Sequence, residues 1–241
     1  MLSSQIYLDA FDADGARLLE VAADALGADV PACPGWDVAQ LVAHVGQVYN
    51  FIGAALDVVG TDDRPSPTAI EVPEGDALIP WLAELHAGLS AKLRATDADA
   101  AAWNWAGTGT AGFFHRRMAH ETLVHRWDAE QAGGVDSTID SDLATDGVDE
   151  ALFVGMQHST NPDRVFEYPT GSLHLHRTDG DGEWLVKTEG ASLVVTHEHA
   201  KGDAAVRGSG PDLLLWIWGR GGDVEIFGDE AVAQAWADAT P

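Results

Sequence analysis

Apolar residues recur every three or four positions along the first two thirds of the chain, a spacing typical of amphipathic helices. The first such series begins near residue 4 and stops before Gly27, a residue type that commonly follows a helix. Asp37 is a candidate N-cap for a second helix. This second helix is predicted at residues 37–59, and further helices are predicted at residues 76–95, 112–132 and 140–157. Long amphipathic helices joined by modest connections predict a bundle.

The pattern changes after residue 158, where short runs of alternating apolar residues predict β-strands separated by Gly/Asp turns. We expect these strands at residues 171–178, 184–188, 191–196, 204–208 and 224–227. Two short helices are expected among them, at residues 211–218 and 230–237. The predicted fold class is therefore α plus α+β. The expected domains are a helical bundle at residues 1–157 and a small α+β domain at residues 158–241.

Charge narrows the range of partners. The chain has 39 acidic and 13 basic side chains and a formal net charge of −26, which repels nucleic acids and anionic membranes. Cys33 is the only cysteine, so an internal disulfide is excluded and a reducing compartment fits. The N-terminal residues lack the basic segment and apolar core of a signal peptide. We expect a cytoplasmic protein, monomeric or homodimeric, with small molecules as partners.

The sequence H-E-T-L-V-H at residues 120–125 carries the clearest candidate chemistry. Zinc proteases place two histidines four positions apart on a helix, whereas His120 and His125 are five apart. At about 100° per residue they would point roughly 140° apart, which does not suit a shared ion. Glu121 and His125 are four apart and share a face. One carboxylate and one imidazole make two ligands of a metal site.

A third ligand must come from another helix, and the second predicted helix offers His44. Its neighbours Leu41, Val45 and Val48 mark the apolar side of that helix, so His44 is expected to face inward. A packed core histidine is the alternative interpretation. An inward-facing Glu121 is costly unless it is paired or bound to a metal, and bundles commonly build metal sites from facing helices.

Three segments resemble the mycothiol-dependent maleylpyruvate isomerase family, which shares the DinB-like four-helix metal bundle. They are C-P-G-W-D-V-A-Q-L-V-A-H (33–44), F-F-H-R-R-M-A-H-E-T-L-V-H-R-W-D-A-E (113–130) and D-L-L-L-W-I-W-G-R (212–220). The resemblance implies that His44, Glu121 and His125 are the zinc ligands and that mycothiol is the thiol cosubstrate. The C-terminal part resembles the small sterol-carrier-like α+β domain.

The resemblance implies an enzyme in which a metal-bound thiolate attacks an electrophilic carbon of a small substrate. The product would be a cis-trans isomer of the maleylpyruvate type or, in an S-transferase, the thiol adduct itself. Arg220 is the candidate for binding a substrate carboxylate, with Arg207 and Arg117 as weaker ones. The alternative function is a non-catalytic small-ligand-binding protein with a structural metal in its bundle.

A rival metal site lies in the second half of the chain. His174 and His176 are two residues apart, as are His197 and His199, and residues two apart share one face of a strand. If the two strands paired, four imidazoles could gather around one ion. The alternatives are two strand edges that face solvent, or segments in which His199 has already left the strand.

Overall fold

The computed structural model describes residues 1–160, 163 and 165–239. The chain divides into two compact units, Met1–Thr138 and Ile139–Pro241. Each unit has its own set of buried apolar side chains. No helix of the described residues is both long and apolar enough to cross a membrane.

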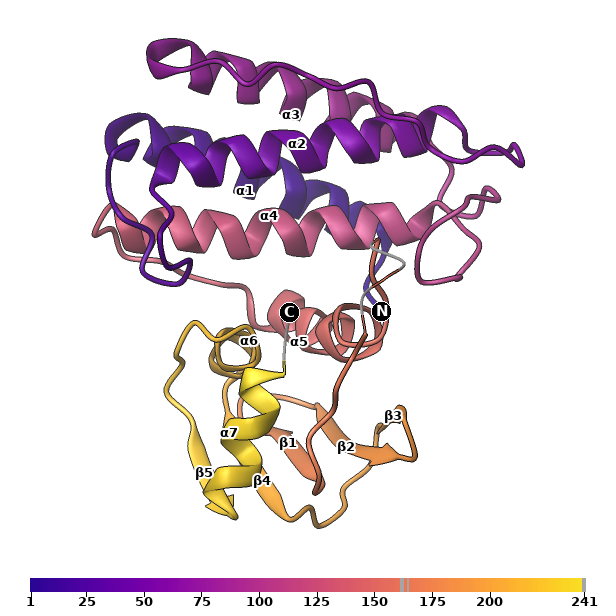
Figure 1. Cartoon of the computed structure of the whole chain (residues 1–241), viewed down its shortest axis with the longest axis vertical. Coiled ribbons are helices and arrows are strands. Elements are labelled where there is room, and N and C mark those ends of the chain that lie inside the picture. The colour runs from indigo at the N-terminus through magenta and orange to yellow at the C-terminus, as the bar shows by residue number, and fades with distance from the viewer. Residues whose placement is uncertain (161–162, 164, 240–241) are drawn as a thin grey trace. The chain divides into compact units, whose positions relative to one another are not determined.

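The first unit is a bundle of four long helices. They are α1 (Ser4–Ala25), α2 (Val38–Asp57), α3 (Leu78–Ala95), which follows the short turn η1 (Gly75–Ala77), and α4 (Gly112–Ala132). In Figure 1 these helices lie side by side, and α1 packs along α4 while α2 packs along α3. The predicted bundle is therefore confirmed, and each helix lies within a few residues of its expected range.

Local sequence explains where α2 begins. The side chain of Asp37 accepts a hydrogen bond from the amide of Gln40, and the Gln40 side chain accepts one from the amide of Asp37. This reciprocal capping box satisfies backbone donors that the helix itself leaves unpaired. Beyond the cap, Leu41, Val42 and Val45 are buried, and they hold the face of α2 that lies beside His44 against the bundle.

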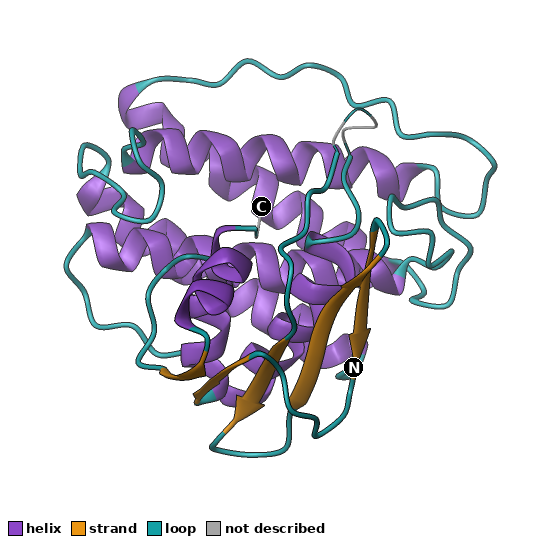
Figure 2. Cartoon of the chain, turned by 60° about the horizontal axis from the view of Figure 1, so that its bottom comes forward, coloured by secondary structure: helices purple, strands orange, loops and turns teal. Residues whose placement is uncertain are grey.

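The second unit combines helices with one five-stranded sheet. Its elements are α5 (Ser141–Glu150), the π-helical turn η2 (Ala151–Gly155), β1 (Leu173–Arg177), β2 (Glu183–Glu189), β3 (Ser192–Thr196), β4 (Ala204–Gly208), α6 (Gly210–Ile217), β5 (Glu225–Gly228) and α7 (Glu230–Asp238). The strand order is β3-β2-β1-β4-β5; β1 and β4 are parallel and the other pairs antiparallel. Figure 2 shows the strands together with the shorter helices. The predicted α+β fold is confirmed.

The division between the units lies earlier than the sequence suggested. The expected boundary followed residue 157, whereas the compact units divide between Thr138 and Ile139. The reason is that α5 packs against α6 and thus belongs to the second unit. Two polar contacts support this assignment: Arg177 of β1 donates to Asp142 of α5 at 2.9 Å, and the Trp184 indole donates to Asp149 at 3.1 Å.

Candidate metal centre

Three donor side chains meet inside the bundle unit. His44 comes from α2, and Glu121 and His125 come from adjacent turns of α4. Oε1 of Glu121 lies 3.3 Å from Nε2 of His44 and 3.4 Å from Nε2 of His125. The two imidazole rings meet edge to face, with centroids 5.0 Å apart. The structure therefore brings together the three residues that helical spacing and the family resemblance selected.

This arrangement fits the requirements of a zinc ion. Four-coordinate zinc binds histidine nitrogen and carboxylate oxygen at about 2.0–2.1 Å, so neighbouring donors of a tetrahedral shell lie about 3.3–3.4 Å apart. The two distances to Oε1 of Glu121 match that separation. Two imidazoles and one carboxylate form a donor set typical of zinc sites with one remaining position.

Glu121 is held as a carboxylate by its neighbours. Burial favours its neutral form, but the positive charge of Arg117 and hydrogen bonds from His125 and His44 outweigh burial and keep the pKa well below its ordinary value. Arg117 lies one helical turn before Glu121 and contacts its other oxygen, Oε2. This ion pair fixes the carboxylate and leaves Oε1 directed toward the two imidazoles. Arg117 was a candidate for substrate binding, but the structure pairs its guanidinium with Glu121.

His125 is oriented by a carboxylate on its far side. Its Nδ1 lies 3.0 Å from Oδ2 of Asp128, whose side chain is fully buried. Burial opposes a charged imidazole, but the hydrogen bonds and charges of Asp128 and Glu121 outweigh it and raise the pKa of His125 to about 9. A carboxylate on one ring nitrogen leaves the other, Nε2, to face a metal.

Other side chains complete the surroundings of the group. The ring of Trp36 lies 5.3 Å from that of His44, measured between centroids. The thiol of Cys33 lies 4.0 Å from Oδ2 of Asp128, so it contacts a residue that orients a donor. The side chain of His44 is 37% exposed, compared with 12% for His125, which places the accessible side of the group at α2.

Several neighbours in the sequence lie outside the group. His120 is buried against the edge of Tyr7 and is not among the clustered donors, as helical spacing predicted. Arg126 and Asp128, which flank His125 in the sequence, bind different residues. Arg126 binds Asp14 and Glu130, and Asp128 binds His125.

The candidate arginines of the second unit have partners close by. Arg220 follows α6, and its guanidinium donates to the carbonyl of Trp218 at 2.8 Å. Arg207 lies over the ring of Phe227 and 3.9 Å from Glu225, the ion pair expected of a surface arginine. A role for Arg220 in substrate binding stays a prediction.

The rival histidine group is only partly assembled as expected. His174, His176 and His199 lie together, but the fourth member is Glu183 and not His197. His197 stacks on Phe153 and contacts Asp149 instead. Sequence reasoning missed Glu183, which faces the histidines only because of how β1 and β2 pair.

Comparisons with known proteins agree with both units. Residues 8–130 match the family model of the mycothiol maleylpyruvate isomerase N-terminal domain, and residues 142–235 match that of the MDMPI C-terminal domain. The gap between the two matches contains the division between the compact units. No curated protein matches the chain.

Two solved structures share the fold. Both are crystal structures of the mycothiol-dependent maleylpyruvate isomerase, one of them of a mutant in which a histidine is replaced by alanine. The mutant has 16% sequence identity and a TM-score of 0.64, and the other has 17% identity and a TM-score of 0.62. In each case 93% of this chain and 93% of the other are covered. On the strength of both family matches, this chain belongs to the mycothiol maleylpyruvate isomerase family.

Proposed function

We propose that the protein is a thiol-dependent isomerase of the maleylpyruvate type, with mycothiol as cosubstrate and a divalent ion, preferably zinc, at His44, Glu121 and His125. The observation that carries this proposal is the approach of both imidazoles to one carboxylate oxygen, at 3.3 and 3.4 Å, in a unit that matches the family. The two structural neighbours are of a mycothiol-dependent isomerase, which supports the choice of thiol.

Each residue around the three donors would have its own role in the proposed reaction. When bound, a zinc ion would supply the positive charge that lowers the pKa of a thiol, so that a thiolate is available at neutral pH. Asp128 holds the ring of His125 with Nε2 directed toward Glu121. Arg117 neutralises Glu121 and fixes its plane. The side chain of His44 is 37% exposed, so we expect small molecules to enter on its side of the centre.

The reaction that fits such a site uses the thiolate as a temporary nucleophile. The thiolate adds to one carbon of a double bond conjugated with a carbonyl group, and the electron pair of that bond moves toward the carbonyl oxygen. The former double bond is then a single bond and can rotate. When the electron pair returns, the double bond re-forms in the other configuration and the thiolate leaves. The thiol is regenerated, and no oxidant or reductant is consumed.

Substrates of this kind carry carboxylates, and we propose that Arg220 binds one of them. A guanidinium can hold a carboxylate through two parallel hydrogen bonds. Arg220→Met should then raise the KM for the keto acid and leave the affinity for mycothiol unchanged. Arg207→Met is the matched control because Arg207 already has Phe227 and Glu225 beside it.

The decisive experiment is turnover of maleylpyruvate and other unsaturated keto acids by zinc-loaded protein, with mycothiol, with glutathione and with no thiol. We expect isomerisation with mycothiol alone, and loss of it in His125→Ala. A product that retains the thiol would identify an S-transferase. Binding of small molecules without turnover would favour the non-catalytic alternative. The proposal fails if zinc-loaded protein does not bind mycothiol by calorimetry.

A further inference from the structure

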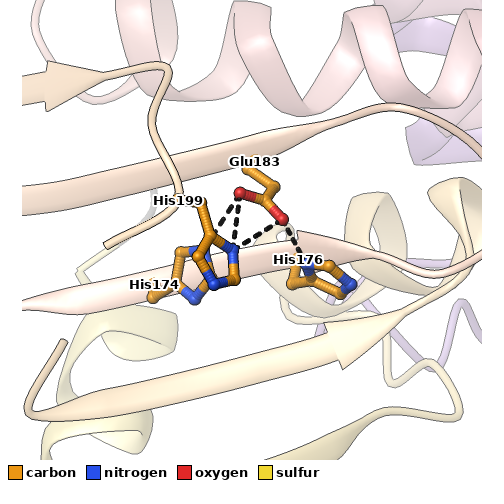
Figure 3. A group of neighbouring side chains, drawn as sticks. All are labelled: His174, His176, Glu183 and His199. Carbon is orange, nitrogen blue, oxygen red and sulfur yellow. Dashed lines mark hydrogen bonds and ion pairs between the residues drawn. The ribbon is translucent and has the colours of Figure 1, made fainter. Parts of the chain in front are cut away.

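A second group of potential ligands lies in the α+β unit. It consists of His174, His176, Glu183 and His199, each of which offers one donor atom within 4.8 Å of the others. Figure 3 shows the three imidazoles gathered around the carboxylate of Glu183. Nδ1 of His176 lies 2.7 Å from this carboxylate and Nδ1 of His199 lies 2.9 Å from it.

Strand pairing places three of the four residues. His174 and His176 are two apart on β1 and therefore project from the same face of the strand. β1 and β2 are antiparallel, and in their register His176 lies directly opposite Glu183. Side chains at directly opposed positions of neighbouring strands are close enough to interact. The sheet itself thus positions two imidazoles and one carboxylate.

The fourth residue comes from the connection between β3 and β4, residues 197–203. Asp203 anchors the end of this connection to the start of β1 by accepting hydrogen bonds from the amide and hydroxyl of Ser172, at 2.7 and 2.8 Å. At Gly202 a side chain would come within 2.9 Å of the backbone nitrogen of His174, so only glycine allows this close approach. The connection therefore passes β1 at His174 and brings His199 to the other two rings, with centroids 5.4 and 6.2 Å away.

His174 shows that hydrogen bonding within the group is incomplete. Its Nε2 is buried and makes no hydrogen bond to any residue in the described part of the chain. The carboxylate of Glu183 lies 3.9 Å away, beyond hydrogen-bonding distance. A buried polar atom without a hydrogen-bond partner lowers stability, and native structures rarely contain one. A cation among the four residues would give this nitrogen a partner.

We propose that His174, His176, Glu183 and His199 bind a divalent transition-metal ion of the zinc class, at a site separate from the bundle centre and independent of the proposed function. Imidazole and carboxylate donors suit zinc, cobalt and nickel better than calcium or magnesium. The separations of 2.7, 2.9 and 3.9 Å from Glu183 bracket the roughly 3.3 Å expected between donors on a tetrahedral ion, so small side-chain rotations suffice.

A shell of four protein donors leaves no open position, which is typical of structural metal sites. The ion would join β1, β2 and the 197–203 connection. His199 is 79% exposed, so an ion can enter from solvent at that side. The formal charge of −26 also favours the accumulation of cations near the protein.

The test uses untagged full-length protein in which Glu121→Gln and His125→Gln remove the bundle centre. Zinc binding is measured by calorimetry, and the coordination geometry by the visible absorption of bound cobalt. We expect one ion per chain, tetrahedral cobalt absorption and a zinc-dependent rise in Tm. His176→Ala and His199→Ala, both at partly exposed positions, should each weaken zinc binding at least about 10-fold and abolish the rise in Tm.

His197→Ala is the matched control, because His197 is an exposed histidine of the same connection that contacts Asp149 and Phe153. It should leave zinc affinity unchanged. The proposal is wrong if the background protein binds no zinc, or if His176→Ala and His199→Ala bind zinc as the background does. Equal weakening by His197→Ala would also overturn it, because the ion would then lie elsewhere in the connection.

Discussion

Nδ1 of His125 lies 3.0 Å from Oδ2 of Asp128, a carboxylate that is completely buried one turn further along α4. The pair determines which nitrogen of His125 is available to a metal, because a neutral ring that donates through Nδ1 presents Nε2 as a lone pair. That Nε2 is the atom 3.4 Å from Glu121. Asp128 is not one of the three candidate ligands, yet its contact with His125 sets the orientation of that ring in the centre.

Asp128→Asn should weaken zinc binding at the bundle centre by about 10- to 100-fold without abolishing it. The amide keeps the shape of the side chain but loses the charge that supports His125. Affinity can be measured by competition with a chromophoric chelator. Asp24→Asn, at an exposed position of α1, is the control and should change nothing. Equal affinities for wild type and Asp128→Asn would show that this contact does not support the centre.

Two histidines of α4, His120 and His125, allow a direct comparison. His125→Gln should reduce the zinc content by one ion per chain, since it removes a donor of the group. His120→Gln should leave the zinc content unchanged, because His120 lies against Tyr7 and outside the group. Elemental analysis after dialysis measures both. If His120→Gln loses zinc while circular dichroism shows an intact fold, His120 is a ligand of the ion. The exclusion of His120 by helical spacing would then be wrong.

Much of the fold could be predicted because its signals are local. Helical spacing located the bundle helices, Asp37 marked the start of α2, and alternation located the strands. The relation between Glu121 and His125 also needs only the geometry of one helix. Selecting His44 as the third ligand required the further assumption that the apolar side of α2 faces inward. The burial of Leu41 and Val45 shows that this assumption is correct.

The remaining features depend on tertiary structure. Buried residues occupy most sides of α4, so periodicity could not show whether Asp128 and Arg126 face solvent or the interior. The assignment of α5 to the second unit follows from its packing on α6, which no local pattern encodes. Glu183 joins His176 only through the register of β1 with β2, and His197 leaves the expected histidine group by contacting Asp149.

A buried ion pair should dominate the electrostatic stability of the bundle unit. Glu130 accepts from Arg126 at 2.6 Å and from Arg17 at 2.8 Å, and the Arg126 side chain is only 5% exposed. Glu130→Ala should lower the free energy of unfolding by about 3 kcal/mol, because it leaves Arg126 with Asp14 as its remaining carboxylate. Urea unfolding followed by circular dichroism provides the measurement.

Glu20→Ala is the matched control for Glu130→Ala. Glu20 binds the same Arg17 at 2.8 Å, but its side chain is 70% exposed. An exposed ion pair contributes less than about 1 kcal/mol, so Glu20→Ala should change the free energy of unfolding very little. If the two variants lose similar amounts of unfolding free energy, the burial of Glu130 does not strengthen its ion pairs with Arg126 and Arg17.

Asp179 should make the stability of the α+β unit depend on acid pH. Burial favours its protonated form, but hydrogen bonds from Ser141, Arg177 and the amide of Gly210 outweigh it and lower the pKa to about 2. A pKa below the unfolded value of about 3.9 means that the ionised carboxylate stabilises the fold. This contribution is complete above about pH 4 and is lost as the pH falls toward 2. The difference in unfolding free energy between wild type and Asp179→Asn should therefore be constant from pH 7 to 5 and shrink by pH 3. A difference that stays constant down to pH 3 would contradict the assignment.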